Sequence, residues 1–192
     1  MSDILPAQGT RLTPTQMLEL FQAQGISFKN HHHDPVFTTE ESKHLKKDIA
    51  GAHCKSLFVK DKKGVCKLLV CAEHWRIDMK QFAKTAGFGR PSFGKPELMK
   101  QLLGVTPGSV TPFALVHDTD CQVECWLDVW MLQQGLVNYH PLVNSQTTTM
   151  AATDLIRFLT AAGHTPRYID LETYQEVEAS ALDIPAIDTI PS

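Results

Sequence analysis

The stretch Gly51–Gly64 constrains the fold most, because it carries the clearest β-hairpin signal in the chain. Two apolar runs, His53–Lys60 and Val65–Ala72, flank the polar loop Asp61–Gly64. A four-residue polar loop that ends in glycine is typical of a turn between two adjacent strands. The sequence therefore predicts a β-hairpin here, with Lys55 set between small residues at the mouth of its first strand.

The remaining elements follow from apolar periodicity and from capping residues. Helices are expected over 13–24, about 38–47, 77–86, 96–103 and 154–162, the last capped by Thr153 or a neighbour. Further strands are expected over 26–33, 92–94, 112–117, 122–130, 137–142 and, as the last one, 167–171. Strands interspersed with helices and joined by hairpins favour an α+β fold with a mixed or antiparallel sheet.

The length of 192 residues suits one domain with a sizeable core. We expect this domain to span residues 1–171. Residues 172–192 are acidic, contain Pro185 and Pro191, and are expected to form a peripheral C-terminal tail with partial helix. The formal net charge of −3 argues against a broad non-specific nucleic-acid binder, although it leaves room for a local basic patch.

Neither a signal peptide nor a membrane-spanning run is visible, so we expect a cytoplasmic protein with no membrane partner. Thiols stay reduced in that compartment. The five cysteines offer neither a disulfide framework nor a zinc-ligand spacing, so they are expected to act as small buried apolar residues. In the run of three histidines, His31 and His33 share one face of a strand and His32 takes the other, which disfavours joint chelation. No metal and no cofactor are therefore expected.

Five stretches of the chain resemble the prolyl-tRNA editing superfamily, which comprises the YbaK family and the insertion domain of bacterial prolyl-tRNA synthetases. The stretches are His33–Glu41, Gly51–Gly64, Leu102–Leu115, His140–Met150 and Ala152–Pro166, and the resemblance as a whole spans roughly residues 12–171. The most similar branch is that of the free-standing ProX-type deacylases. The resemblance implies a curved, barrel-like mixed sheet, largely antiparallel and surrounded by helices.

The resemblance also implies a function in translation fidelity. It implies an enzyme that acts in trans and hydrolyses the ester of mischarged proline tRNA, with Ala-tRNA(Pro) as the first candidate substrate. The expected partners are the tRNA and, second, prolyl-tRNA synthetase, and the protein itself is expected to be a monomer or a weak homodimer. Hydrolysis of this activated ester needs no metal, because positioning and oxyanion stabilisation suffice.

The family's functional residues fall on definite positions of this sequence. Its lysine falls on Lys55 and the histidine of its His-Pro turn falls on His140, so both are expected to be catalytic. The expected substrate-binding residues are Ser56, Gly104, Gly108, Ser109, Asn144, Thr147 and Thr148. The expected tRNA contacts are Lys46, Lys47, Lys60, Lys62 and Lys63, within a wider basic region that includes Lys43 and Lys67.

Each of these residues also has a structural interpretation. Lys55 either neutralises a phosphate of the tRNA end, or donates to the ester carbonyl, or extends to solvent along the strand. His140 either orients the terminal ribose or the attacking water, or forms a turn with its backbone neighbours. The three tryptophans are expected in the core or at its rim rather than as base-stacking platforms: Trp75, Trp126 and Trp130.

Two departures from the family pattern keep alternative functions open. Ser56 stands where ProX-type enzymes often have asparagine, and Asn144–Thr148 reads N-S-Q-T-T instead of N-T-A-T-T. The alternatives are a deacylase for Cys-tRNA(Pro) or another small amino acid such as serine or threonine, a non-catalytic tRNA- or synthetase-binding module, and, more remotely, a Cys/His metal enzyme. A small pocket would exclude proline by size, with Val36, Phe37 and Leu57 as candidate walls.

Overall fold

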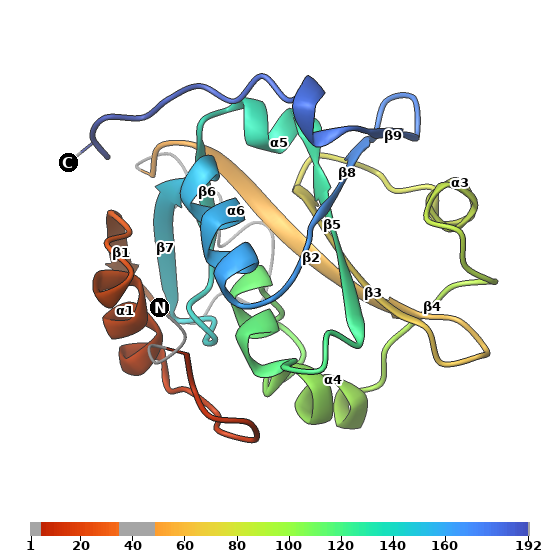
Figure 1. Cartoon of the computed structure of the whole chain (residues 1–192), viewed down its shortest axis with the longest axis horizontal. Coiled ribbons are helices and arrows are strands. Elements are labelled where there is room, and N and C mark those ends of the chain that lie inside the picture. Colours follow the sequence, from red (N-terminus) through yellow and green to blue (C-terminus); the bar gives the residue numbers. More distant parts are fainter. Residues whose placement is uncertain (1–4, 35–48, 192) are drawn as a thin grey trace.

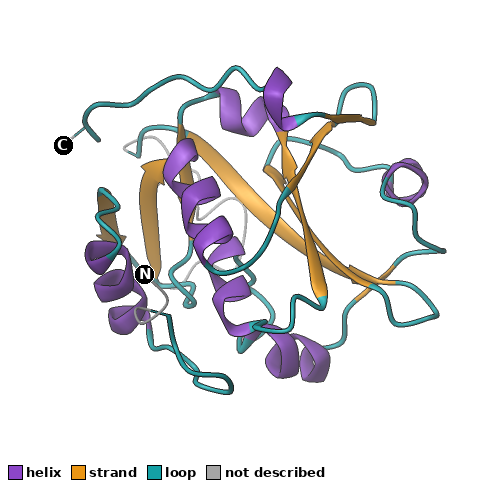
Figure 2. Cartoon of the chain, viewed as in Figure 1, coloured by secondary structure: helices purple, strands orange, loops and turns teal. Residues whose placement is uncertain are grey.

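The structure, a computed structural model, describes residues 5–34 and 49–191, which form a nine-stranded mixed sheet with helices packed against it (Figure 1). The strands are β1 Phe28–His32, β2 Ala52–Lys60, β3 Cys66–Ala72, β4 Ser92–Phe93, β5 Val123–Asp128, β6 Leu136–Tyr139, β7 Gln146–Ala151, β8 Arg167–Asp170 and β9 Gln175–Val177. The helices are α1 Pro14–Ala23, α3 Met79–Thr85, α4 Pro96–Leu103, α5 Val129–Gln133 and α6 Ala152–Ala161, with 3₁₀ helices at Pro112–His117 and Ala179–Ala181 (Figure 2).

The strand order is β1-β7-β6-β2-β3-β5-β8-β9, with β4 paired to the far end of β2. Among the described strands, β2–β6, β3–β5 and β5–β8 pair in parallel, and the other pairs are antiparallel. The expected α+β class with a mixed, mostly antiparallel sheet is therefore confirmed. The expected hairpin is also present, since β2 and β3 pair from Cys54↔Ala72 to Lys60↔Cys66.

The two faces of the sheet carry two different cores, because side chains alternate along each strand. The main core holds Phe21 of α1, Phe158 of α6 and Phe113 of the first 3₁₀ helix, whose rings meet edge to face. The second core lies on the opposite face of β2, β3 and β5, under α3, and is centred on Phe82 and Trp126. β2 therefore contributes to both cores, so that successive residues along this strand lie in different environments.

Local signals placed most helix ends correctly. Thr13 and Gln16 form a reciprocal capping box at the start of α1, and Asp78 accepts two backbone N–H bonds at the start of α3. Gly104 ends α4 in the left-handed conformation at φ 69°. The expected cap of α6 is wrong, because the position before the helix is Ala151, which has no side-chain cap.

Two expectations about strands are also wrong, and one strand was not expected. The run Pro112–His117 is a buried 3₁₀ helix, begun by Pro112 and by the Thr111 hydroxyl, which accepts the N–H of Phe113. A short fully buried apolar run has no alternation that could distinguish strand from helix. The strand expected to reach Trp130 stops at Asp128, whose carboxylate caps α5. In addition, β7 forms over residues for which no strand was expected.

The C-terminal tail is partly built into the sheet. β8 is not the last strand, because β9 pairs with it antiparallel, and Arg167 of β8 binds the carboxylate of Glu176 in β9. Further along the tail, Ile187 packs against Gly135: a Cβ added to Gly135 would lie 2.8 Å from the Cδ1 of Ile187. The helix expected over 38–47 lies outside the described residues.

The cysteine side chains are mostly buried. Burial raises the pKa of Cys54 and of Cys71 to about 12, so neither thiol is ionised near neutral pH. Cys121 is the exposed one. In the part of the chain that the structure describes, no helix is long and apolar enough to span a bilayer.

His117 connects the N-terminal segment to α4. Its Nδ1 lies 2.8 Å from the carbonyl oxygen of Leu103 and its Nε2 lies 3.0 Å from the backbone nitrogen of Leu12. Because Nε2 accepts that N–H, the imidazole must be neutral. Burial is the main cause that lowers the pKa of His117 below its ordinary 6.5, and Arg11 adds to this, although the Leu103 carbonyl opposes it.

This geometry predicts a pH-dependent stability. Below the unfolded pKa the unfolded chain takes up a proton that folded His117 does not, so the free energy of unfolding falls as the pH drops through about 6.5. The expected result is a lower urea midpoint at about pH 5.5 than at about pH 7.5, with part of that difference removed in His117→Gln. An identical pH dependence in both proteins would contradict this role.

Candidate functional site

Polar side chains gather on the sheet face opposite the main core, at the end formed by β1, β7 and β6. On these strands the residues that alternate with main-core positions point to this face, which we call the polar face: His31, Asn138, His140, Thr147 and Thr149. Thr149 donates to the amide oxygen of Asn138 at 2.6 Å, so neighbouring strands are linked across the face. The strand alternation therefore lines this face of the sheet with polar side chains, of which Asn138 and Thr149 are buried.

Lys55 and His140 lie at the same level of two parallel strands. β2 and β6 pair only through Ala52↔Val137 and His53↔Asn138, among the described residues. Lys55 comes two residues after His53, and His140 comes two residues after Asn138. Because alternation has a period of two, both side chains leave the sheet on the polar face, where the pairing between their strands stops.

The Lys55 ammonium is held by the loop that follows β3. Its Nζ donates to the carbonyl oxygen of Glu73 at 3.1 Å and also to that of Trp75. An ammonium has three N–H donors, and these two contacts use two of them. The half-buried Lys55 side chain is therefore anchored at the rim of the sheet rather than extended into solvent.

His140 and His33 lie beside each other. The Nδ1 of His140 is 2.7 Å from the carbonyl oxygen of Gln146, an acceptor that fixes the proton of a neutral ring on Nδ1. The His33 ring centroid lies 6.3 Å from that of His140, and its Nε2 is 2.9 Å from the Thr147 hydroxyl. His33 was not expected in the site, because its role depends on the pairing of β1 with β7, and its only sequence signal was its place at the start of a matched stretch.

Two expected substrate-binding residues lie on the opposite face. Ser56 follows Lys55 and therefore points toward the main core, opposite Val70. Thr148 is fully buried on the same side and donates to the amide oxygen of Asn30 at 2.8 Å. Of the polar residues expected around Lys55, the polar face thus holds His140 and Thr147 but neither of these two.

The expected substrate-binding residues Gly104 and Gly108 lie in two different environments. At Gly104 the space that a Cβ would need is filled by Arg11 and His117, at 2.7 and 3.0 Å, so this glycine serves the packing of the N-terminal segment. Gly108 lies near the Asn144 amide, 3.9 Å from where its Cβ would be, so the structure brings these two together. Ser109 is buried and its N–H donates to Thr106 at 3.0 Å.

Of the lysines expected to contact tRNA, the three that the structure describes lie at the far end of the hairpin. Lys60 follows Lys55 by five strand residues, about 16 Å at the usual rise, and Lys62 and Lys63 are exposed in the turn. The Asp61 carboxylate accepts the N–H groups of Lys63, Val65 and Gly89 and thereby fixes the turn. Two lysines and two candidate pocket residues lie outside the described residues: Val36, Phe37, Lys46 and Lys47.

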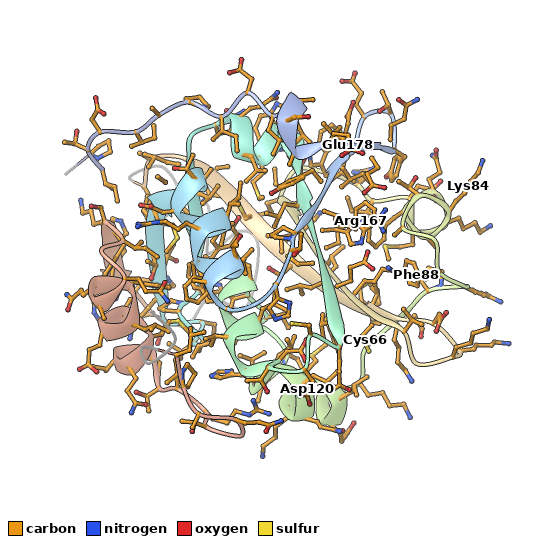
Figure 3. All side chains as sticks on the ribbon, viewed as in Figure 1. Cys66, Lys84, Phe88, Asp120, Arg167 and Glu178 are labelled. Carbon is orange, nitrogen blue, oxygen red and sulfur yellow. The ribbon has the colours of Figure 1, made fainter. Side chains whose placement is uncertain are left out.

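Lys67 is not part of an exposed basic region. Its side chain is almost completely buried, and its Nζ binds Glu124 at 2.8 Å with the Phe88 ring on one side. Arg167 binds the same Glu124 and covers the Trp126 ring at 4.3 Å; Figure 3 labels Arg167 and Phe88 in this part of the molecule. The predicted wall residue Leu57 packs in the second core instead.

Comparisons with known proteins show which family the chain belongs to. The model of the aminoacyl-tRNA editing domain family matches residues 33–158. The prolyl-tRNA editing protein ProX of Acetoanaerobium sticklandii is 31% identical over 147 residues, which cover 76% of this chain and 90% of that protein. The prolyl-tRNA synthetase associated domain-containing protein 1 of Danio rerio is 35% identical over 137 residues, which cover 70% of this chain and 74% of that protein.

The fold is shared with solved structures at lower identity. A crystal structure described as that of a candidate trans-editing enzyme for prolyl tRNA synthetase superposes with a TM-score of 0.64 at 19% identity, covering 84% of this chain and 98% of that one. The matched residues of the family model include the whole polar face except His31, together with Lys55. The chain therefore belongs to the aminoacyl-tRNA editing domain family, which confirms the family indicated by the five stretches of its sequence.

Proposed function

We propose that this protein is an aminoacyl-tRNA deacylase that hydrolyses mischarged proline tRNA in trans, with Ala-tRNA(Pro) as its main substrate. The observation that carries the proposal is the convergence of Lys55 and His140 on one face, where β2 and β6 stop pairing. Membership of the editing-domain family and the similarity to a prolyl-tRNA editing protein support the same reaction.

Lys55 stabilises the charge that develops during hydrolysis. Water attacks the ester carbonyl, an oxyanion forms, and the bond to the terminal ribose oxygen breaks. The two carbonyl oxygens that hold Nζ fix the ammonium in place and leave one N–H for the oxyanion or for a nearby phosphate. A preorganised donor of this kind typically lowers the barrier by about 3 kcal/mol.

His140 orients the terminal ribose or the attacking water. With its proton on Nδ1, its Nε2 is the nitrogen that accepts a hydrogen bond from the terminal ribose hydroxyl or the attacking water. Beside His140, the contact between Thr147 and His33 limits the rotation of these two side chains. The imidazole thus contributes position and a proton acceptor, while Lys55 contributes charge.

A panel of mischarged proline tRNAs tests this proposal. We expect rapid release of alanine, slower release of cysteine, serine or threonine, and no release of proline, since a pocket rejects an oversized side chain more easily than a smaller one. If cysteine, serine or threonine is released fastest, then that amino acid, and not alanine, is the main substrate. Normal tRNA binding with no hydrolysis of any ester would contradict a deacylase and indicate a binding module.

Ser56→Asn restores the residue that ProX-type enzymes often carry at this position. Because Ser56 points toward the main core, away from Lys55, we expect the ratio of alanine to cysteine release to change by less than about threefold. The measurement is kcat/KM for both mischarged tRNAs with the wild type and the variant. A larger change in this ratio would show that Ser56 reaches the amino acid and would support the alternative substrate.

A further inference from the structure

Three rings from two elements form a series beside Lys55. His74 and Trp75 lie in the loop after β3, and their ring centroids are 4.9 Å apart. The Trp130 ring, from α5, meets His74 edge to face at 4.5 Å. Trp130 is 41% exposed, unlike Trp126, which is completely buried. The expected core or rim positions therefore fit Trp126 in the core and Trp130 at the rim, where the Trp130 side chain is accessible to solvent.

One buried carboxylate sets the position of this series. The Oδ2 of Asp128 accepts the indole N–H of Trp75 at 2.8 Å and the backbone N–H of Ala72 at 3.1 Å. Its Oδ1 accepts the backbone N–H of Trp130 at 3.1 Å. Because Asp128 is fully buried and bonded to both elements, the loop after β3 and the start of α5 are fixed relative to each other.

The inner end of the series is the anchor of Lys55. The carbonyl oxygen of Trp75, one of the two acceptors of the Lys55 ammonium, belongs to the innermost ring residue. Exposed Arg76 follows directly and adds a cation at the same rim. A ligand that reaches Lys55 from this side therefore passes aromatic faces and a positive charge, which is the combination that single-stranded nucleic acid requires.

We propose that Trp130 and His74 form the stacking platform for the unpaired 3′-terminal base of the tRNA. This proposal rests on the proposed function, since Lys55 can mark the position of the terminal ribose only if the ester is hydrolysed there. The base on that same ribose must then lie near Lys55. The exposed Trp130 side chain is linked to the anchor of Lys55 through His74 and Trp75, so we assign the base to it. Base–aromatic stacking does not depend on the base sequence, so the platform contributes affinity and orientation rather than tRNA identity.

The first test measures binding without catalysis. The probe is uncharged proline tRNA with either an intact 3′-terminal adenosine or a terminal nucleotide that lacks its base. For the wild type, we expect loss of the base to raise Kd about tenfold, whereas Trp130→Ala should bind both probes with the same weakened affinity. Trp130→Phe keeps a stacking face and should bind within a few-fold of the wild type.

The second test measures turnover of Ala-tRNA(Pro). We expect Trp130→Ala to raise KM about tenfold with little change in kcat, because stacking acts equally on the ground and transition states. Phe93→Ala is the matched control, since Phe93 is a 65% exposed aromatic residue on β4, away from Asp128. The platform would be overturned by an unchanged KM in Trp130→Ala. It would also be overturned if loss of the terminal base raised Kd by the same factor in the wild type and in Trp130→Ala. Either result would leave the assignment of Lys55 intact.

A third outcome would point to a different partner. If Trp130→Ala leaves the Kd for tRNA unchanged but weakens binding to purified prolyl-tRNA synthetase, then the exposed ring is a protein contact and the stacking proposal is wrong. If Lys55→Ala retains full activity, the assignment of Lys55 fails while the deacylase function stands, and the tRNA binding experiment still decides separately whether Trp130 contacts the terminal base. If no mischarged tRNA is hydrolysed at all, the proposed function fails, and the same binding experiment decides the platform.

Discussion

Replacement of Lys55 by alanine is expected to lower kcat for hydrolysis of Ala-tRNA(Pro) by about 10²–10³-fold. The reason is that the carbonyl oxygens of Glu73 and Trp75 hold the Lys55 ammonium in place before the substrate arrives. A donor that is already oriented needs no reorganisation as the oxyanion forms, so its loss affects the transition state most. If the ammonium binds a tRNA phosphate instead, KM rises and kcat changes little.

The control for this variant is Lys100→Ala. Lys100 is an exposed lysine in the last turn of α4, and its removal changes the net charge by the same amount. We expect this control to keep its activity, and both variants to unfold cooperatively in urea as the wild type does. Full activity of Lys55→Ala in a folded protein would refute the assignment of Lys55.

Replacement of Gly51 by alanine is expected to lower the free energy of unfolding by about 3 kcal/mol or more. Gly51 has a φ of 95°, and a Cβ there would lie 2.6 Å from both the Cβ and the carbonyl oxygen of Leu136. The backbone of Leu136 cannot move aside without separating β6 from β2. The contact lies immediately before the pair Ala52↔Val137, so the displaced strands would also separate Lys55 from His140.

Gly64→Ala separates the two causes of this loss. Gly64 has a similar φ of 86°, but a Cβ there would meet nothing within 4 Å. Alanine at this position therefore introduces backbone strain alone, for which we expect about 1 kcal/mol. Urea unfolding of both variants gives the difference between their free energies of unfolding. The kcat of Gly51→Ala, measured at urea concentrations well below its unfolding midpoint, shows whether the substitution also damages the site. Equal destabilisation by both substitutions would contradict the close approach to Leu136.

The parts of the fold that depend on local sequence could be predicted. The turn Asp61–Gly64 fixes the hairpin, Thr13 and Asp78 mark two helix starts, and Gly104 marks a helix end. In each case the residues that determine the conformation are within a few positions of one another. The motifs also singled out Lys55 and His140 as candidate site residues, which stay predictions, and they could not show how the two relate in space.

The parts that depend on long-range pairing could not be predicted. Thr147 points to the polar face and Thr148 to the main core because β7 pairs with β1 and β6, and no local signal reveals that register. The same pairing brings His33 to Thr147. Lys67 looks like a surface residue in the sequence and is buried, because Glu124 comes from a strand that is distant along the chain.

The pairing of β1 with β7 also sets the order of events during synthesis. Phe28 pairs with Met150, so the strand that carries His31 must wait for most of the chain before it finds its partner. Closing such a long loop is slow compared with forming the β2–β3 hairpin, whose strands are adjacent in the sequence. A ribosome-bound chain that ends before β7 therefore contains Lys55 on a formed hairpin but lacks the opposite side of the site. We therefore expect hydrolytic competence to arise only after the residues from Gln146 onward have left the ribosome.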